Sequence, residues 1–141
     1  MVKVRQFYVC SYLISSCVDN QLVKLPKGLG NLEKLKKVYL QNNQLEKLQS
    51  ALGRCIKLET INVENNKLTG VAKRIGNLPN LRHLLLAGNL LKSLPFNPLE
   101  TAPGLRRLTL SGNQLSNDLM KLEKVQDVRM GEITEGGDDD F

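Results

Sequence analysis

The side chains of this 141-residue chain offer little material for catalysis. His83 is the only histidine, and no carboxylate is placed beside it to orient a general base. The sequence contains neither the HExxH pattern of zinc peptidases nor the GxSxG pattern of serine hydrolases. We therefore expect that the protein is not an enzyme and that it has no small-molecule substrate.

Two further groups of residues are candidates for ligand chemistry, and neither has the required spacing. The segment 28–30 (Gly-Leu-Gly) lacks the third glycine of a dinucleotide-binding loop and is expected to form a turn. The cysteines, Cys10, Cys17 and Cys55, show no CxxC or other metal-ligand spacing and are expected to be reduced and mostly buried. No metal and no cofactor are expected.

Regularly spaced asparagines reveal how the chain is organised. Asn20, Asn43, Asn66, Asn89 and Asn113 are separated by 23, 23, 23 and 24 residues. A fixed period of this size indicates a solenoid of stacked repeats. Aliphatic residues accompany the last four asparagines at constant distances: Leu35, Val38, Leu40 and Leu45; Leu58, Ile61, Val63 and Leu68; Leu81, Leu84, Leu86 and Leu91; Leu105, Leu108, Leu110 and Leu115.

This L-x-x-L-x-L-x-x-N-x-L pattern resembles that of the leucine-rich-repeat family, and the resemblance covers nearly the whole chain. Segments 22–26 and 91–95 also match the L-x-x-L-P continuation of the family's 23-residue class, whereas Gln49 and Ala72 replace that proline in other repeats. The resemblance implies a small intracellular adaptor, a phosphatase-regulating subunit or a subunit of a large assembly such as an axonemal dynein. It does not choose among them.

The expected fold is α/β, a leucine-rich-repeat solenoid in the form of a short horseshoe with five repeats plus a degenerate sixth. In each repeat a short strand turns alternate aliphatic residues into the core, and the strands form a concave parallel sheet. About a dozen residues return to the next strand, which suits turns and short helical pieces. The asparagine side chains are expected to bond turn backbone groups, as scaffold rather than as a ligand site.

The first repeat departs from the template. Ile14 and Val18 are apolar residues at outward strand positions, and two explanations remain open. Either residues 1–10 fold over them, or a partner chain covers them. An export or targeting segment within residues 1–18 is a less favoured alternative. The template positions around Asn20 are Val9, Tyr12, Ser15, Cys17, Leu22 and Leu25.

The other end of the array is also degenerate. Residues 119–130 are expected to form a return segment and a last strand, and one amphipathic helix over 118–130 is the alternative. The repeat domain is expected to span residues 1–131, followed by an acidic, flexible tail, 132–141. This tail holds five of the 14 acidic residues and no Lys or Arg, so the rest of the chain is strongly basic. Such a charge distribution suggests acidic partners, or a tail that screens the body when no partner is bound.

The repeat register assigns outward strand residues to the concave face, which is the expected partner-binding site. Basic residues gather there beside an uncharged central column that contains Tyr39 and Leu85. This arrangement suits an acidic protein segment that also offers an apolar anchor. The expected contact residues are Lys36, Lys37, Tyr39, Asn62, Glu64, Arg82, His83, Leu85, Arg106, Arg107 and Thr109.

The alternative partner is nucleic acid, for which the chain would act as a basic subunit contacting phosphate in a ribonucleoprotein. It is less favoured, because the concave face lacks a ladder of exposed aromatic residues and Glu59 and Glu64 interrupt its positive charge. No run of residues approaches the ~20 apolar residues of a membrane span. None of the asparagines begins an N-x-[ST] sequon, which favours a cytoplasmic or another reducing intracellular compartment.

Overall fold

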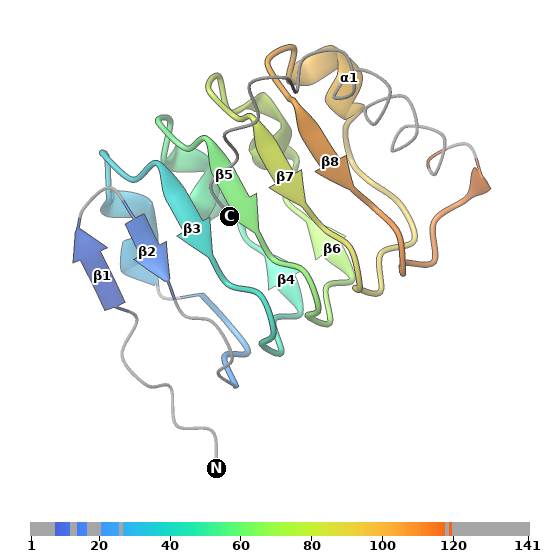
Figure 1. The fold of residues 1–141 in the computed structure, drawn as a ribbon, viewed down its shortest axis with the longest axis horizontal. Coiled ribbons are helices and arrows are strands. Elements are labelled where there is room, and N and C mark those ends of the chain that lie inside the picture. The colour runs from blue at the N-terminus through green and yellow to red at the C-terminus, as the bar shows by residue number, and fades with distance from the viewer. Residues whose placement is uncertain (1–7, 12–13, 17–20, 26, 118, 120–141) are drawn as a thin grey trace, which may run out of the picture.

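The computed structural model describes residues 8–11, 14–16, 21–25, 27–117 and 119. In this part of the chain a six-stranded sheet runs along one side of the solenoid, and the segments between its strands run along the other side (Figure 1). The order of the strands in the sheet is β1-β2-β3-β5-β7-β8. Their bounds are Tyr8–Ser11 for β1, Ile14–Ser16 for β2, Lys37–Tyr39 for β3, Thr60–Asn62 for β5, His83–Leu85 for β7 and Arg107–Thr109 for β8.

The strands β2, β3, β5, β7 and β8 pair in parallel, and their register follows the repeat of the sequence. Ile61 lies opposite Val38 on one side and Leu84 on the other, and Leu84 lies opposite Leu108. These central residues are almost completely buried and belong to one aliphatic core. The expected solenoid with a parallel sheet is therefore confirmed.

Short helical segments close the core on the convex side. Leu29, Leu52 and Ile75 point into the core from three successive segments. The segment 28–30 lies within one of these 3-10 helices rather than in an isolated turn. The helical segments are η1 (Lys27–Asn31), η2 (Ser50–Arg54), η3 (Lys73–Asn77) and α1 (Pro98–Thr101), as expected from the short return segments.

A second, two-stranded parallel sheet on the flank of the solenoid was not expected from the sequence. It consists of β4 (Lys47–Leu48) and β6 (Gly70–Val71), which follow the asparagines of two neighbouring repeats. Leu48 and Val71 are buried, whereas the residues before them are not. The sheet thus joins two repeats beyond the point where the main strands end.

The asparagine side chains tie each repeat to the one before it. The amide of Asn66 donates to Leu40 O and Val63 O, both at 3.0 Å, and its oxygen accepts from Leu45 N at 3.0 Å. Equivalent bonds join Leu22 N, Leu68 N and Leu91 N to the following repeats. The scaffold role expected for these asparagines is confirmed for the four that lie in the described residues, Asn43, Asn66, Asn89 and Asn113.

The residue before each of these asparagines adopts a left-handed backbone conformation. The φ angles are 61° at Asn42, 58° at Asn65, 73° at Gly88 and 72° at Gly112. Asparagine and glycine are the residues that tolerate this conformation best. The recurrence of Asn or Gly at this position is a sequence signal that the repeat template above does not include.

The first repeat differs from the expectation. β1 runs antiparallel to β2, with Tyr8 opposite Ser16 and Val9 opposite Ser15, whereas Ser15 lies opposite Val38 as the template requires. Val9 therefore does not occupy the template position expected of it, the equivalent of Leu32 in the next repeat, because it lies in the antiparallel strand β1. Residues 8–10 lie beside β2 in the sheet rather than folding over Ile14.

Several expectations fall outside the described residues. Tyr12, Cys17, Val18 and Asn20 of the first repeat are among them. So are residues 120–131, on which the sixth repeat and its helical alternative depend, and the acidic segment 132–141.

Candidate binding face

The concave face is formed by outward residues of β3, β5, β7 and β8. The pairing of the strands places Lys37, Thr60, His83 and Arg107 in one column and Tyr39, Asn62, Leu85 and Thr109 in the next. Beyond the strands, backbone bonds continue the order through Gln41, Glu64, Ala87 and Ser111. On the other edge, Lys36, Glu59, Arg82 and Arg106 form a flanking column. These are the columns expected from the sequence.

Exposure varies strongly within the concave face. Lys36 and Arg82 are exposed, and Tyr39 is half-buried. Asn62 is 8% exposed and Leu85 only 4%. Leu85 therefore offers little open apolar surface, in contrast to the anchor role expected of it, because it lies on a central strand with paired neighbours on both sides. Tyr39 is left as the apolar contact of the central column.

Side-chain hydrogen bonds cross the concave face between repeats. The hydroxyl of Thr109 donates to Glu64 Oε2 at 2.7 Å, so that the carboxylate of Glu64 reaches across β7. The same hydroxyl accepts from the backbone N–H groups of Leu86 and Ala87. Asn62 Oδ1 accepts from Glu64 N at 3.1 Å. These bonds fix the position of the Glu64 carboxylate within the face.

Positive charge predominates on the concave face and its flanking column. The basic residues are Lys36, Lys37, Arg82, Arg106 and Arg107, and the acidic residues are Glu59 and Glu64. The basic residues form two groups, Lys36 and Lys37 at β3 and Arg82, Arg106 and Arg107 at β7 and β8, which Glu59 and Thr60 of the intervening repeat separate. This excess of basic over acidic groups attracts acidic ligands and accelerates their association.

His83 lies within the concave face, where its Nδ1 atom contacts a hydroxyl group rather than a carboxylate. Its Nδ1 atom is 3.2 Å from the hydroxyl of Thr60, which is 2% exposed. Thr60 lies in a column of the concave face but was not among the expected contact residues. Its place in the repeat register, beside His83, could have predicted it as a contact residue. Within the described residues no group of three or more His, Cys, Asp or Glu side chains is arranged to hold a metal ion.

Cys55 is a buried free thiol on the convex side, as expected for this cysteine. Its Sγ donates to Leu29 O at 3.3 Å. Burial raises the pKa of the Cys55 thiol, and the nearby charge of Arg54 opposes this only in part. The thiol is thus protonated and packed as a small apolar group, which is typical of a structural cysteine.

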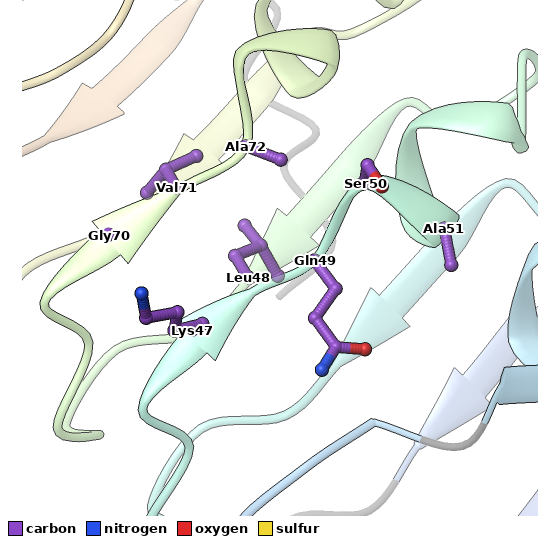
Figure 2. A pocket seen from close by; sticks show the side chains of 8 residues that line it. All are labelled: Lys47, Leu48, Gln49, Ser50, Ala51, Gly70, Val71 and Ala72. Atoms are coloured by element: carbon purple, nitrogen blue, oxygen red, sulfur yellow. The ribbon is translucent and has the colours of Figure 1, made fainter.

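Two of the hollows on the surface differ in their lining, and only the smaller of the two borders an outward column. The larger, about 490 Å³, lies on the flank at β4 and β6, and Figure 2 shows the residues of these strands and of the following segments that line it. A smaller one, about 200 Å³, lies beside Glu59 and Arg82 at the edge of the flanking column. Neither contains a constellation of side chains that would perform chemistry. The larger hollow is lined by Lys47, Leu48, Gln49, Ser50, Ala51, Gly70, Val71 and Ala72.

Comparison with known proteins agrees with this geometry. A family model described as leucine rich repeat matches residues 56–115, where three successive strands and their asparagines lie. The chain is a leucine-rich-repeat protein. No curated protein matches it. Among its described residues, no helix is long and apolar enough to cross a membrane.

Solved structures of leucine-rich-repeat proteins resemble the chain. A leucine-rich-repeat protein of Leptospira interrogans is 32% identical, with a TM-score of 0.67 over 79% of this chain and 27% of its own. The plant peptide hormone receptor RGFR1 in complex with RGF2 is also 32% identical, with a TM-score of 0.59 over 64% of this chain and 15% of its own. An internalin of Listeria monocytogenes, at 22% identity and a TM-score of 0.66 over 76% of this chain and 30% of its own, shares the fold. The chain thus spans less than a third of the length of these relatives.

Proposed function

We propose that this leucine-rich-repeat protein is a non-catalytic interaction module that binds an acidic segment of a protein partner through its concave face. The observation that carries the proposal is the excess of five basic over two acidic residues on the face that holds the half-buried Tyr39. Leucine-rich-repeat proteins are typically non-catalytic and serve protein interaction, and the similar plant receptor RGFR1 is in complex with RGF2. We place the protein in a reducing intracellular compartment such as the cytoplasm, as an adaptor or a subunit of a larger assembly.

The chemistry of the face favours this kind of ligand. Arginines and lysines steer an acidic segment and set its register, while an aromatic side chain supplies contact area at low conformational cost. Glu59 and Glu64 are the two carboxylates that oppose an acidic ligand, and the hydrogen bond from Thr109 fixes the position of the Glu64 carboxylate. Nucleobases would stack on a series of exposed aromatic side chains, and the described columns of the concave face contain only Tyr39 among Phe, Trp and Tyr residues.

The test is photo-crosslinking from the face, followed by titration of the captured partner. Benzoylphenylalanine at position 39 should capture a protein that the same group at position 56 does not. Ile56 is the matched control, because it is 57% exposed and lies on the return side of the solenoid. Capture of the same protein from both positions would contradict the proposal.

Titration at two salt concentrations then separates protein from nucleic acid. For a protein partner, Tyr39→Ala should weaken binding by about 1–3 kcal/mol. Arg82→Ala and Arg107→Ala should act mainly through the association rate and its salt dependence. For a phosphate-backbone partner, each arginine change would lower the slope of log affinity against log salt by about one, and Tyr39→Ala would do little. Variants that all bind like the parent would exclude the concave face as the site.

A further inference from the structure

The chain carries, outside its described repeats, a segment whose charge is opposite to that of the concave face. This acidic segment, residues 132–141, contains five carboxylates and no basic residue. The concave face and its flanking column present five basic residues against Glu59 and Glu64. Of these two carboxylates, Glu64 is already bonded to Thr109. The net attraction between the two regions is therefore of the same kind as that proposed for an acidic partner.

The acidic segment can reach this face. The described chain ends at Leu119, and residues 120–131 separate it from Glu132. Twelve residues span up to about 40 Å when extended. The distance across the face from β8 to β3 is three strand intervals, or about 15 Å, and the thickness of the layer adds about 10 Å. The connection is therefore long enough to place the carboxylates beside any of the basic residues.

Covalent connection makes even weak pairing effective. A ligand tethered by a short connection experiences an effective concentration on the order of 1 mM. A contact with an intrinsic dissociation constant of about 0.1 mM would then be about nine-tenths occupied, and it would weaken an external ligand for the same face by about tenfold. A second copy of the chain at micromolar concentration competes poorly with such a tether.

We propose that the acidic segment binds the concave face of its own chain, with Glu132 and Glu135 beside the arginines at β7 and β8 and the carboxylates of residues 138–140 beside Lys36 and Lys37. This inference rests on the proposed function, because the acidic segment and the external partner would bind the same concave face. The segment then acts as a built-in competitor. Only a partner that contributes more than charge, for example an apolar group on Tyr39, displaces it at low concentration.

A direct test needs no partner. A carbodiimide joins carboxylates to lysine amines that they contact, and the products are identified by mass spectrometry of the full chain. We expect links from residues 138–140 to Lys36 and Lys37 at least fivefold above those to Lys47 and Lys73, which are exposed lysines away from the face. The links should disappear near 1 M salt, where the screening length is about 3 Å. Equal links to all four lysines would overturn the inference.

Isotope mixing assigns the links to one chain or to two. When labelled and unlabelled protein are mixed, links within one chain contain no mixed-mass product. A statistical share of mixed-mass links would overturn the intramolecular contact in favour of self-association.

A competition measurement tests the consequence. The labelled probe is a peptide with the sequence of residues 132–141, and its affinity is measured for the full chain and for the variant D138N/D139N/D140N. The variant should bind the probe about tenfold more tightly than the parent. The matched control is E33Q/E46Q/E100Q, which removes the same charge at exposed positions outside the face and should leave the affinity within about twofold.

The outcomes separate this inference from the proposed function. If the triple variant and the parent bind the probe alike, while a partner captured at position 39 still loses affinity on Tyr39→Ala, the function stands and the inference fails. If the triple variant binds the probe tenfold more tightly than the parent but the group at position 39 captures no partner, the contact within the chain stands and the proposed function fails.

Discussion

Leu84 and Leu85 are neighbours in β7, and they teach how differently the two faces of one sheet are built. Leu84 points into the aliphatic core and is 0% exposed, as are its counterparts Val38 and Ile61. Leu85 points to the concave face, where its counterparts are Asn62 and Thr109, and it lies outside the core cluster. The inner face repeats one chemistry in every strand because each repeat must stack on the next. The outer face is under no such constraint, and its composition is available for a partner.

The largest expected effect is the loss of a core leucine. Leu84→Ala should lower the free energy of unfolding by about 3–5 kcal/mol, because it leaves a closed cavity among well-packed side chains. Leu85→Ala should cost only about 1–2 kcal/mol, since the space that it leaves opens toward solvent. Urea denaturation of both variants measures the difference. Equal losses would show that the concave face is packed as tightly as the core, contrary to the comparison above.

The asparagine ladder comes next. Asn66→Ala removes the acceptor of Leu45 N and the donor to Leu40 O, and both backbone groups are buried. It should reduce the free energy of unfolding by about 2–3 kcal/mol. Asn80→Ala is the control, because Asn80 is exposed and bonds only to Ile56 O among the described residues; it should change stability by less than about 0.5 kcal/mol. If Asn66→Ala left the free energy of unfolding unchanged, water would have to replace the hydrogen bonds of the amide.

Backbone conformation should have a smaller effect. Gly88→Ala forces alanine to a φ of 73° and brings its Cβ against the side chain of Asn65, so we expect a loss of about 1–2 kcal/mol. Gly70→Ala is the control, since nothing lies within 4 Å of the added Cβ and the backbone is not left-handed. Thermal unfolding of the two variants distinguishes them. The expectation fails if Gly70→Ala is the more harmful change.

The smallest effect on stability is expected on the concave face itself. Tyr39→Ala should change the free energy of unfolding by less than about 1 kcal/mol, because the side chain is only half-buried. The same change should lower affinity for the captured partner about tenfold or more. Calorimetry on the same preparation provides both values. A loss of stability larger than that of Leu85→Ala would assign Tyr39 to the scaffold instead.

The part of the fold that could be predicted is the part in which local chemistry recurs. The 23-residue spacing of the asparagines predicts the parallel register of Val38, Ile61 and Leu84, because stacked repeats place equal template positions opposite each other. The same register predicts which side chains point to the concave face. Function could be predicted only as far as this surface, since the outward residues do not repeat.

What could not be predicted depends on contacts that no local pattern contains. β4 and β6 are two residues long, too short to show alternation. Val9 has the spacing of a template residue and lies in a hairpin strand instead. The bond from Thr109 to Glu64 joins residues 45 apart, and its existence depends on the packing of three strands. The burial of Leu85 likewise follows from lateral neighbours rather than from the direction of its side chain.

The antiparallel strand β1 has a consequence for how copies of this molecule meet. Each parallel strand of a solenoid is a template on which another repeat of the same polarity could stack, and such head-to-tail contacts do not close but grow into filaments. At β1 the polarity is reversed, because β1 pairs antiparallel with β2. A neighbouring molecule can still hydrogen-bond there, but it cannot add a repeat in register. Among the described strands, the series of parallel repeats thus ends at β2, because the strand beside it runs in the opposite direction.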